Sequence, residues 1–330
     1  MRTIDKILCV HQGYELYGSD RSFVLSVRIL RKIYPDAIID VIIPKNGEIQ
    51  TLLRPICNNL IINKKLAILR KKEFRNNPFK FLYKVITGVY NAINASKNYD
   101  VIYVNTIVVL DYIIASRFTS TTNILHVREI PTGIQKTIFS KILSFSKMKM
   151  IFNSNNTAIS YSLPINQIKT TILNGVNGYT DNINNIKDKT INILLLGRLT
   201  EWKGQIFFLE TINKLLNLKR YIIQVRIVGD VFEDQLEYKD KLIAFVKTYN
   251  LENIVTFKSF SKNPELEYYW ANIVIVPSIK PEPFGRVAIE AMSIGRCVVA
   301  ANHGGLSEII SHNEDGVLFE PNNLKSLLYE

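Results

Sequence analysis

The chain is poor in several residues that would assign it to other classes of protein. Its 330 residues include three cysteines, two tryptophans and four histidines. Cys9, Cys57 and Cys297 lie far apart in apolar runs, and no C-x-x-C pair or histidine cluster of the kind that holds zinc is present in the sequence. We therefore expect buried, reduced thiols and neither disulfides nor a zinc site.

Long hydrophobic runs are also missing. No apolar run approaches the roughly 20 residues that a membrane-spanning helix needs. Met1 to Lys6 lead directly into the short apolar stretch Ile7–Val10, without the apolar core of a signal peptide. We therefore expect a cytoplasmic protein. With 47% hydrophobic residues the chain can form packed cores, and its length suits two α/β domains of about 150 residues each.

Short apolar strands alternate with longer helical patterns, which is typical of parallel α/β sheets. Two sets of strands are predicted, one near residues 7–12, 38–44, 101–105, 123–128, 150–153 and 169–173, and the other near 191–196, 222–228, 254–258, 273–277, 297–301 and 317–319. An Asn- and Asp-rich stretch between the sets predicts a linker at 179–190, which joins a domain at 1–178 to a domain at 191–330. Ligands of such sheets bind outside the carboxyl ends of the strands.

The segment at residues 277–290 carries the most chemical information. An apolar strand is ended there by prolines, and helical apolar spacing begins near Phe284. The free N–H groups of a helix start, with Gly285 allowing close approach, form a site for a phosphate. Glu282 precedes this site and Glu290 lies about 9 Å along the helix, at roughly 1.5 Å per residue. Two carboxylates around an anion site fit a sugar nucleotide.

This segment resembles the E-x7-E signature of the retaining GT-B glycosyltransferases, particularly glycosyltransferase family 4 (glycosyl transferases group 1). The stretch from Gly197 through Arg198 and Lys203 to Gly204 is similar to the family's G-R-L-x-x-x-K-G. Weaker matches are a Gly-Asp turn at 229–230 and N-G-V-N at 174–177, close to the family's N-G-V-D. Ser259 stands where the family usually has glycine.

The resemblance implies a GT-B fold, in which two Rossmann-like parallel α/β domains face each other across a cleft. It also implies retaining transfer of a sugar from a nucleotide-diphosphate donor to a glycan or lipid-linked acceptor, in cell-surface polysaccharide synthesis. The first domain would bind the acceptor and the second the donor. Family members normally continue beyond the apolar pattern at 324–328, so a truncated or short second domain is expected.

The resemblance also implies roles for individual residues of the second domain. Arg198 and Lys203 would stabilise the leaving diphosphate by charge, and we expect both at the surface. Glu282 would hold sugar hydroxyls and Glu290 the ribose. The helix start and the neighbouring turn, formed by Phe284, Gly285 and Gly197, would complete the donor site.

In the first domain the resemblance is looser. Gly18 belongs to a Gly-Ser-Asp turn that is expected to open the first helix and contact the donor, where the family often has G-G-x-E. The spacing of Gly13 and Gly18 does not make a dinucleotide-binding G-x-G-x-x-G. His126 matches a family histidine near the donor sugar, although a core role is equally open. The Arg128-Glu129 pair after it is expected to line the acceptor cleft or to pair internally.

No Asp-x-Asp motif of the metal-dependent transferases occurs in the sequence, so neither a metal nor a cofactor besides the donor is expected. Two other functions stay open. One is a non-catalytic glycosyltransferase-like scaffold that binds a nucleotide or glycan, and the other is a GT-B sugar-nucleotide epimerase.

The formal net charge of +12 is unevenly distributed. Residues 64–84 hold eight basic residues and one acidic residue, interleaved with Leu66, Ile68, Leu69, Phe74, Phe79, Phe81, Leu82 and Tyr83. This pattern predicts an element that touches an anionic membrane from the cytoplasmic side, and a solvated helix face is the alternative. Nucleic-acid binding has no support from a helix-turn-helix, RNP or zinc-finger pattern.

Overall fold

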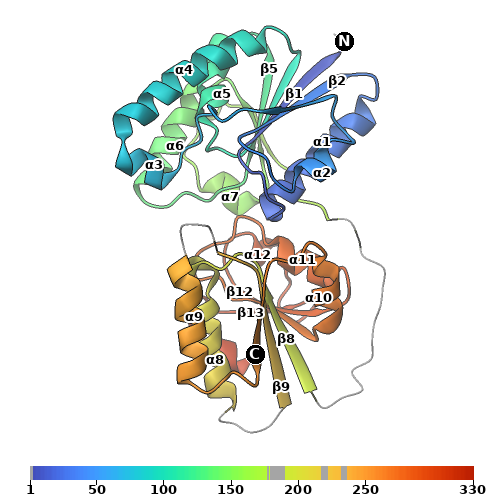
Figure 1. The fold of residues 1–330 in the computed structure, drawn as a ribbon, viewed down its shortest axis with the longest axis vertical. Helices are drawn as coiled ribbons and strands as arrows, with labels where there is room; N and C mark the ends of the chain where they lie inside the picture. The colour runs from blue at the N-terminus through green and yellow to red at the C-terminus, as the bar shows by residue number, and fades with distance from the viewer. Residues whose placement is uncertain (1–2, 177, 179–189, 217–221, 232–235) are drawn as a thin grey trace. The chain divides into compact units, whose positions relative to one another are not determined.

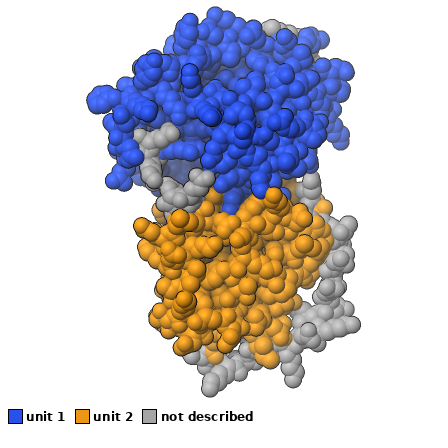
Figure 2. All heavy atoms as spheres, viewed as in Figure 1, with its two compact units in different colours: residues 1–174 blue, residues 175–330 orange. Residues whose placement is uncertain are grey.

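The computed structural model divides the chain into two compact units, residues 1–174 and residues 175–330 (Figure 2). It describes residues 3–176, 178, 190–216, 222–231 and 236–330. The linker predicted at 179–190 lies outside these residues except for Thr190, which begins a strand.

The first unit is built on a seven-stranded parallel sheet in the order β3-β2-β1-β4-β5-β6-β7 (Figure 1). Its strands are β1 (Lys6–His11), β2 (Ile38–Ile43), β3 (Asn59–Ile62), β4 (Val101–Asn105), β5 (Thr122–Val127), β6 (Lys149–Phe152) and β7 (Lys169–Thr171). Its helices are α1 (Gly18–Ile33), α2 (Gln50–Leu53), α3 (Lys71–Asn76), α4 (Pro78–Ser96), α5 (Leu110–Ala115), α6 (Ile134–Phe145) and α7 (Asn155–Ile159), with a 3-10 turn η1 at Ser116–Phe118.

The second unit is built on a six-stranded parallel sheet in the order β10-β9-β8-β11-β12-β13. Its strands are β8 (Thr190–Leu196), β9 (Ile222–Val228), β10 (Val255–Lys258), β11 (Ile273–Val276), β12 (Cys297–Ala301) and β13 (Val317–Phe319). Its helices are α8 (Gln205–Leu216), α9 (Leu236–Thr248), α10 (Pro264–Trp270), α11 (Arg286–Met292), α12 (Leu306–Ile309) and α13 (Leu324–Tyr329), with a 3-10 turn η2 at Glu201–Lys203.

The central strands are continuous apolar runs because helices cover both faces of each sheet. All five residues of β4 are buried, as are the last five of β1. Each unit has its own core: Val10, Val104 and Leu125 belong to the core of the first, and Leu195 and Ile227 to a core of the second.

Both sheets reverse their strand order at one place, between β1 and β4 in the first unit and between β8 and β11 in the second. Crevices at the carboxyl ends of such strands are the usual ligand sites of doubly wound sheets. The two parallel sheets confirm the predicted α/β class with two Rossmann-like domains. The loops after β1, β4, β8 and β11 are therefore the candidate ligand sites.

The structure corrects several details of the sequence-based predictions. Strand β3 was not expected; it is a short edge strand with mostly exposed residues, so its sequence lacks a buried face. Helix α11 begins at Arg286, two residues after Phe284, because Gly285 has a left-handed φ of 106° that a helix cannot continue. The three cysteines are free, but only Cys9 is buried; Cys57 is half-buried and Cys297 is exposed at the start of β12.

Candidate functional site

The loops after β8 and β9 fit closely together at the switch point of the second sheet. Gly197 directly follows β8 and has a φ of 149°, and a Cβ on Gly229 would lie 1.9 Å from the carbonyl oxygen of Gly197. The Leu199 N–H donates to the Asp230 carbonyl at 3.0 Å. The G-R-L stretch and the Gly-Asp turn therefore form one packed backbone unit, and Arg198 stands on it half-buried.

Lys203 and Glu282 meet in this region, although 79 positions separate them in the sequence. The Lys203 ammonium lies 2.5 Å from Glu282 Oε1, and their side chains are 22% and 6% exposed. Ser278 Oγ donates to the same carboxylate oxygen at 2.5 Å. Lys203 is thus held in a partly buried ion pair, with 22% of its side chain exposed.

The backbone explains how the two loops come together. Gly204, directly after Lys203, has a left-handed φ of 78°, and a Cβ there would lie 2.0 Å from the Pro277 carbonyl oxygen. The Ile279 N–H donates to the Trp202 carbonyl at 2.9 Å. The loop after β8 therefore lies directly on the loop after β11, which places the ammonium beside the carboxylate.

His303 makes a hydrogen bond to the backbone of the loop after β11. Its Nε2 lies 2.8 Å from the Ser278 carbonyl oxygen, which can only accept, so this nitrogen carries hydrogen. Burial lowers the pKa of His303 below its usual range, so the neutral ring holds the loop by a donated hydrogen bond. The sequence analysis did not identify His303, since nothing in its neighbours shows that β12 ends beside Ser278.

Glu290 lies apart from this ion pair, on the buried side of α11. Its carboxylate accepts from Tyr268 Oη at 2.8 Å and from Arg286 at 2.7 Å, so each oxygen has a protein partner. Phe284 is 4% exposed and anchors the turn, and a Cβ on Gly285 would lie 2.5 Å from the Leu306 side chain. The structure therefore brings Lys203 and Glu282 into contact, whereas Glu290 is held by its own helix and by α10.

The first unit carries a second polar cluster at its own switch point. His11 and Asn105 are the last residues of β1 and β4, His126 is the last but one of β5, and strand pairing sets the three side by side in register. Their side chains are 0%, 0% and 8% exposed. Buried polar side chains need hydrogen-bond partners, and these three find them mainly in one another and in the neighbouring loops.

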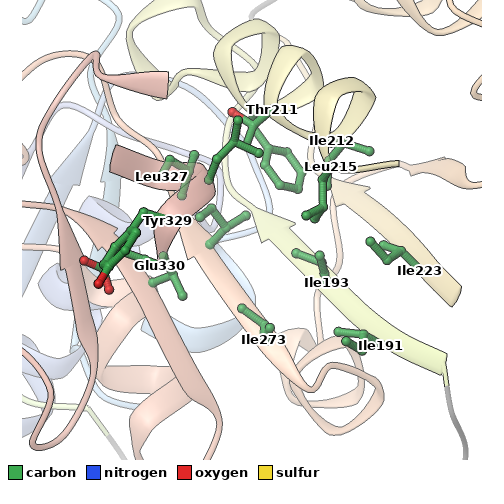
Figure 3. A pocket seen from close by; sticks show the side chains of 14 residues that line it. Ile191, Ile193, Thr211, Ile212, Leu215, Ile223, Ile273, Leu327, Tyr329 and Glu330 are labelled. Atoms are coloured by element: carbon green, nitrogen blue, oxygen red, sulfur yellow. The ribbon is translucent and has the colours of Figure 1, made fainter. Parts of the chain in front are cut away.

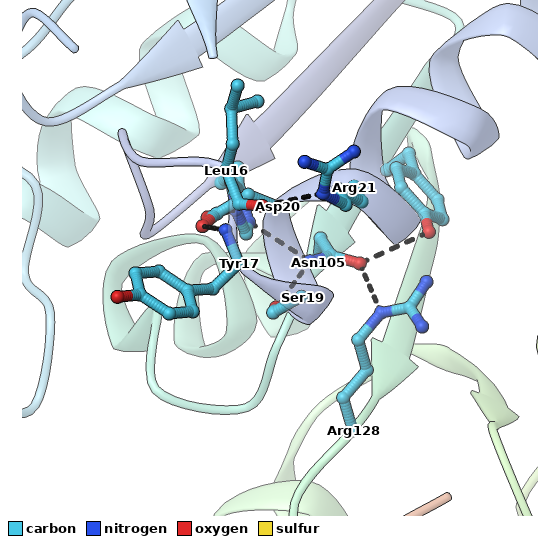
Figure 4. Close-up of polar contacts among 9 residues, drawn as sticks. Leu16, Tyr17, Ser19, Asp20, Arg21, Asn105 and Arg128 are labelled. Atoms are coloured by element: carbon cyan, nitrogen blue, oxygen red, sulfur yellow. Dashed lines mark hydrogen bonds and ion pairs between the residues drawn. The ribbon is translucent and has the colours of Figure 1, made fainter. Parts of the chain in front are cut away.

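The network runs from the first loop to the loop after β5 (Figure 4). Asp20 accepts from His11 Nε2 at 2.8 Å and from the Tyr17 N–H at 3.0 Å, while Asn105 Nδ2 contacts His11 Nδ1 at 3.0 Å. Arg128 donates to Asn105 Oδ1 at 2.7 Å. Gly18 is the first residue of α1, which places it beside this network.

His126 is neutral at physiological pH. Burial, and then the charge of Arg128, lower its pKa to about 2. Its Nδ1 lies 2.9 Å from Tyr103 Oη and 3.0 Å from an Arg128 nitrogen, and its Nε2 is buried with no hydrogen-bond partner among the described residues. The ring can therefore donate to a ligand but cannot serve as a base.

The loop after β4 is strained beside this cluster. Thr106 has a φ of 84°, which is unusual for a β-branched residue and costs about 1–3 kcal/mol. Burial raises the pKa of Glu129, and the carboxylate accepts from the N–H groups of Ile107 and Arg128 at 3.2 and 3.0 Å. The sequence analysis did not identify His11, Asp20 or Asn105 as site residues. His11 and Asn105 had an available signal, since each is a polar residue at the end of a predicted strand, whereas no such signal marks Asp20.

A separate apolar pocket of about 360 Å³ lies in the second unit (Figure 3). Its lining includes Ile191, Ile223 and Ile273, near the amino ends of β8, β9 and β11, together with Leu327 of α13. It is therefore at the opposite end of the strands from Lys203 and Glu282. Within the described residues, no group of three or more His, Cys, Asp or Glu side chains is arranged to hold a metal ion.

The ion pair yields a stability prediction. Replacing Lys203 by Met should lower the free energy of unfolding by about 1–3 kcal/mol, because the mostly buried Glu282 carboxylate loses its charged partner. The additional change Glu282→Gln should recover part of that loss, and urea titration of the single and double variants measures the coupling. The exposed pair Lys241–Glu201, at 4.0 Å, supplies the control: Lys241→Met should change stability by less than about 0.5 kcal/mol. Equal losses at both lysines would contradict the prediction.

Comparisons with known proteins show which family model and which relatives the chain is similar to. Residues 179–328 match the family model described as glycosyl transferases group 1. An uncharacterized glycosyltransferase of Methanocaldococcus jannaschii is 30% identical over 51% of this chain and 45% of its own length. The lipopolysaccharide 1,2-N-acetylglucosaminetransferase of Salmonella typhimurium is 31% identical over 44% of this chain and 39% of its own length. The chain thus spans less than half the length of these curated relatives.

Solved structures match over almost the whole chain. HepE of Anabaena in complex with UDP and glucose has a TM-score of 0.76 at 22% identity, and the match covers 98% of this chain and 88% of that chain. Sucrose-phosphate synthase of Thermosynechococcus elongatus has a TM-score of 0.77 at 19% identity, with the same coverage. Residues 179–328 are therefore similar to the glycosyl transferases group 1 family model, and the chain has the two-domain, Rossmann-like GT-B fold.

Proposed function

We propose that the protein is a retaining hexosyltransferase of family 4, which moves a sugar from a nucleotide-diphosphate donor to a glycan or lipid-linked acceptor in cell-surface polysaccharide synthesis. The observation that carries the proposal is the contact between Lys203 and Glu282 at the switch point of the second sheet, directly beside the backbone that carries Arg198. A fixed cation and a carboxylate are thereby held where ligands of such sheets bind.

The chemistry follows from the charges at this point. Breaking the glycosidic bond of a sugar nucleotide leaves negative charge on the diphosphate, so fixed cations that face it stabilise the transition state. Lys203 keeps further N–H donors for a phosphate oxygen while one contacts Glu282, because an ammonium has three. Glu282 Oε1 receives both Lys203 and Ser278, which leaves Oε2 for a sugar hydroxyl.

Retention requires the acceptor to attack from the face that the diphosphate leaves. A donor phosphate oxygen on that face takes the proton of the acceptor hydroxyl, and His126 has no part in this transfer because its pKa is too low. Its Nε2–H instead donates to a sugar or acceptor oxygen. Glu290 is proposed to accept from the ribose hydroxyls, in competition with Arg286 and Tyr268.

Known relatives support a sugar nucleotide as the donor. HepE has been solved with UDP and with UDP-glucose, and the Salmonella relative is named for transfer of N-acetylglucosamine. A thermal-shift screen of UDP-, GDP- and ADP-sugars identifies the base. Slow hydrolysis of the bound donor would favour the transferase over a non-catalytic scaffold, and interconversion of two donors without an acceptor would indicate an epimerase.

Arg198→Ala should lower the rate of donor turnover by about 10² to 10³, since it removes one charge-assisted contact to the developing diphosphate. Its melting temperature should stay close to wild type, in contrast to Lys203→Met, which loses both turnover and stability. Hydrolysis of the preferred sugar nucleotide, measured below each melting temperature, separates the two effects. A wild-type rate in Arg198→Ala would remove this residue from the mechanism.

We also propose that the reaction needs no metal. Arg198, Lys203 and the backbone N–H groups after Gly285 supply the positive charge that a divalent ion provides elsewhere. Turnover should therefore persist in an excess of chelator. Loss of turnover that magnesium or manganese restores would overturn this proposal.

The basic segment at residues 64–84 is proposed to hold the protein at the inner, anionic face of a membrane. The structure changes which apolar residues take part: Leu66, Ile68 and Phe81 are at most 7% exposed and belong to the core. The exposed apolar side chains continue instead along one face of α4, at Phe79, Leu82, Tyr83, Ile86 and Tyr90, which are between 55% and 84% exposed. Their spacing of three and four residues keeps them on one side of the helix.

Basic side chains lie beside these exposed apolar residues. Lys64, Lys65, Lys80 and Lys84 line an open groove of about 1000 Å³ together with Tyr83, Ile86 and Tyr90. Aromatic and aliphatic residues flanked by lysines suit the boundary between anionic headgroups and acyl chains. Among the described residues, no helix has the length and apolar character that crossing a bilayer demands.

Two pairs of substitutions test the membrane proposal. Lys80→Glu/Lys84→Glu and Phe79→Ser/Tyr83→Ser should each abolish sedimentation with vesicles of anionic lipid, and the wild type should not sediment with zwitterionic vesicles. Each basic residue near such a surface contributes about 1 kcal/mol, which salt weakens. Lys241→Glu/Lys247→Glu on α9 makes the same charge change as a control. If both α4 variants still sediment like the wild type, the segment is a solvated face.

A further inference from the structure

Arg128 occupies a particular position in the buried network of the first unit. Its guanidinium donates to three acceptors: Asn105 Oδ1 at 2.7 Å, Asn174 Oδ1 at 2.6 Å and His126 Nδ1 at 3.0 Å. Arg128 is 8% exposed. A guanidinium has five N–H donors and no acceptor, so every group that faces it must present a lone pair.

Because Arg128 can only donate, it fixes which atoms of its neighbours accept hydrogen bonds, both on the side of β1 and on the side of β5. Toward β1, Asn105 must turn its oxygen to Arg128 and its amide nitrogen to His11 Nδ1, which lies 3.0 Å away. His11 Nδ1 therefore accepts and its Nε2 donates to Asp20. Each nitrogen of His11 has a partner, so this branch ends in a satisfied carboxylate.

On the side of β5, the same argument leaves the last N–H group of the network without a partner among the described residues. His126 Nδ1 accepts from Arg128, so in the neutral ring the hydrogen is on Nε2. That Nε2 is buried and has no hydrogen-bond partner among the described residues. A buried donor without a partner is costly, by about 1–3 kcal/mol, and such groups are typical of ligand sites.

We propose that Arg128 is a positioning residue: it holds His126 in the tautomer that carries hydrogen on Nε2, so that the ring donates to a ligand oxygen. The inference deepens the proposed function, since that oxygen belongs to a hydroxyl of the sugar or the acceptor. Removing Arg128 frees His126 Nδ1 to carry the hydrogen, and Nε2 then meets the same ligand as an acceptor.

Two other groups near the ring bear on its protonation. Tyr103 of β4 places its hydroxyl 2.9 Å from His126 Nδ1 and 3.0 Å from Ser26 Oγ, so it is a competing donor to the same nitrogen. Glu129 follows Arg128, but its carboxylate faces the N–H groups of Ile107 and Arg128. Tyr103→Phe is therefore the matched control for Arg128→Met, because each removes one donor from Nδ1.

The test is ¹⁵N–¹H NMR of the histidine rings in the whole chain without ligand, which needs no substrate and so stands apart from the proposed activity. The chain has four histidines, and His126→Gln assigns the signal. In the wild type, His126 should show hydrogen on Nε2 and no titration between pH 5 and 8. An Nδ1–H pattern, or titration in that range, would overturn the proposal.

The variants then assign the cause. Tyr103→Phe should keep the Nε2–H pattern, Arg128→Met should weaken it, and the double variant should give a mixture of tautomers. If Tyr103→Phe shifts the ring as far as Arg128→Met does, Tyr103 sets the tautomer and the proposal fails. In turnover assays Arg128→Met should lower kcat/KM about tenfold, the equivalent of roughly one hydrogen bond, whereas the exposed control Arg117→Met should not. If Arg128→Met lost stability while the His126 ring kept its Nε2–H pattern, that result would also contradict the proposal.

Discussion

The structure depends on parallel strand pairing, which brings the carboxyl ends of neighbouring strands to one edge. In the first unit the pairing sets His11 opposite Asn105 and Asn105 opposite His126. In the second, β8 pairs with β11, and the loops that follow them bring Lys203 to Glu282. A polar residue at the end of one buried strand would be costly to bury alone. Several polar residues in register can form hydrogen bonds with one another, which removes most of that cost.

The two polar clusters differ in how their charges are balanced. In the second unit an ammonium and a carboxylate are joined directly, so the proposed donor diphosphate would meet a cation that is already fixed in place. In the first unit Arg128 donates to the neutral acceptors of Asn105, Asn174 and His126. The branch through His126 ends at Nε2, which has no hydrogen-bond partner among the described residues. The first arrangement suits stabilisation of developing charge, whereas the second suits recognition of a hydroxyl.

The exposed face of α4 lies in the same unit as the His126 cluster. The loop from Asn63 to Arg70 connects the lysine-lined groove to the segment that follows the carboxyl end of β4. Ile68 forms a β-bridge with Val109, and the Ala67 N–H donates to Asp111 at 2.9 Å. Val109 and Asp111 follow β4, whose end carries Asn105. A membrane contact at α4 would therefore be connected through packed backbone to the strand ends, which suits an acceptor that is attached to a lipid.

The sequence by itself determined the two parallel sheets, because apolar runs in the central strands and helical spacing between them are local signals. Twelve of the predicted strands are present, and the one that was missed, β3, is an exposed edge strand without an apolar face. The motifs also placed Arg198, Lys203 and Glu282 on loops at strand ends. Tertiary structure alone decided that Lys203 pairs with Glu282, that Glu290 is held by Tyr268 and Arg286, and which nitrogen of His126 is left to donate. The contacts of Lys203 with Glu282 and of Tyr268 with Glu290 join segments 79 and 22 positions apart, which no local pattern encodes. Arg286 is four positions from Glu290 and Arg128 two from His126, but only the folded side-chain directions decide that these pairs meet.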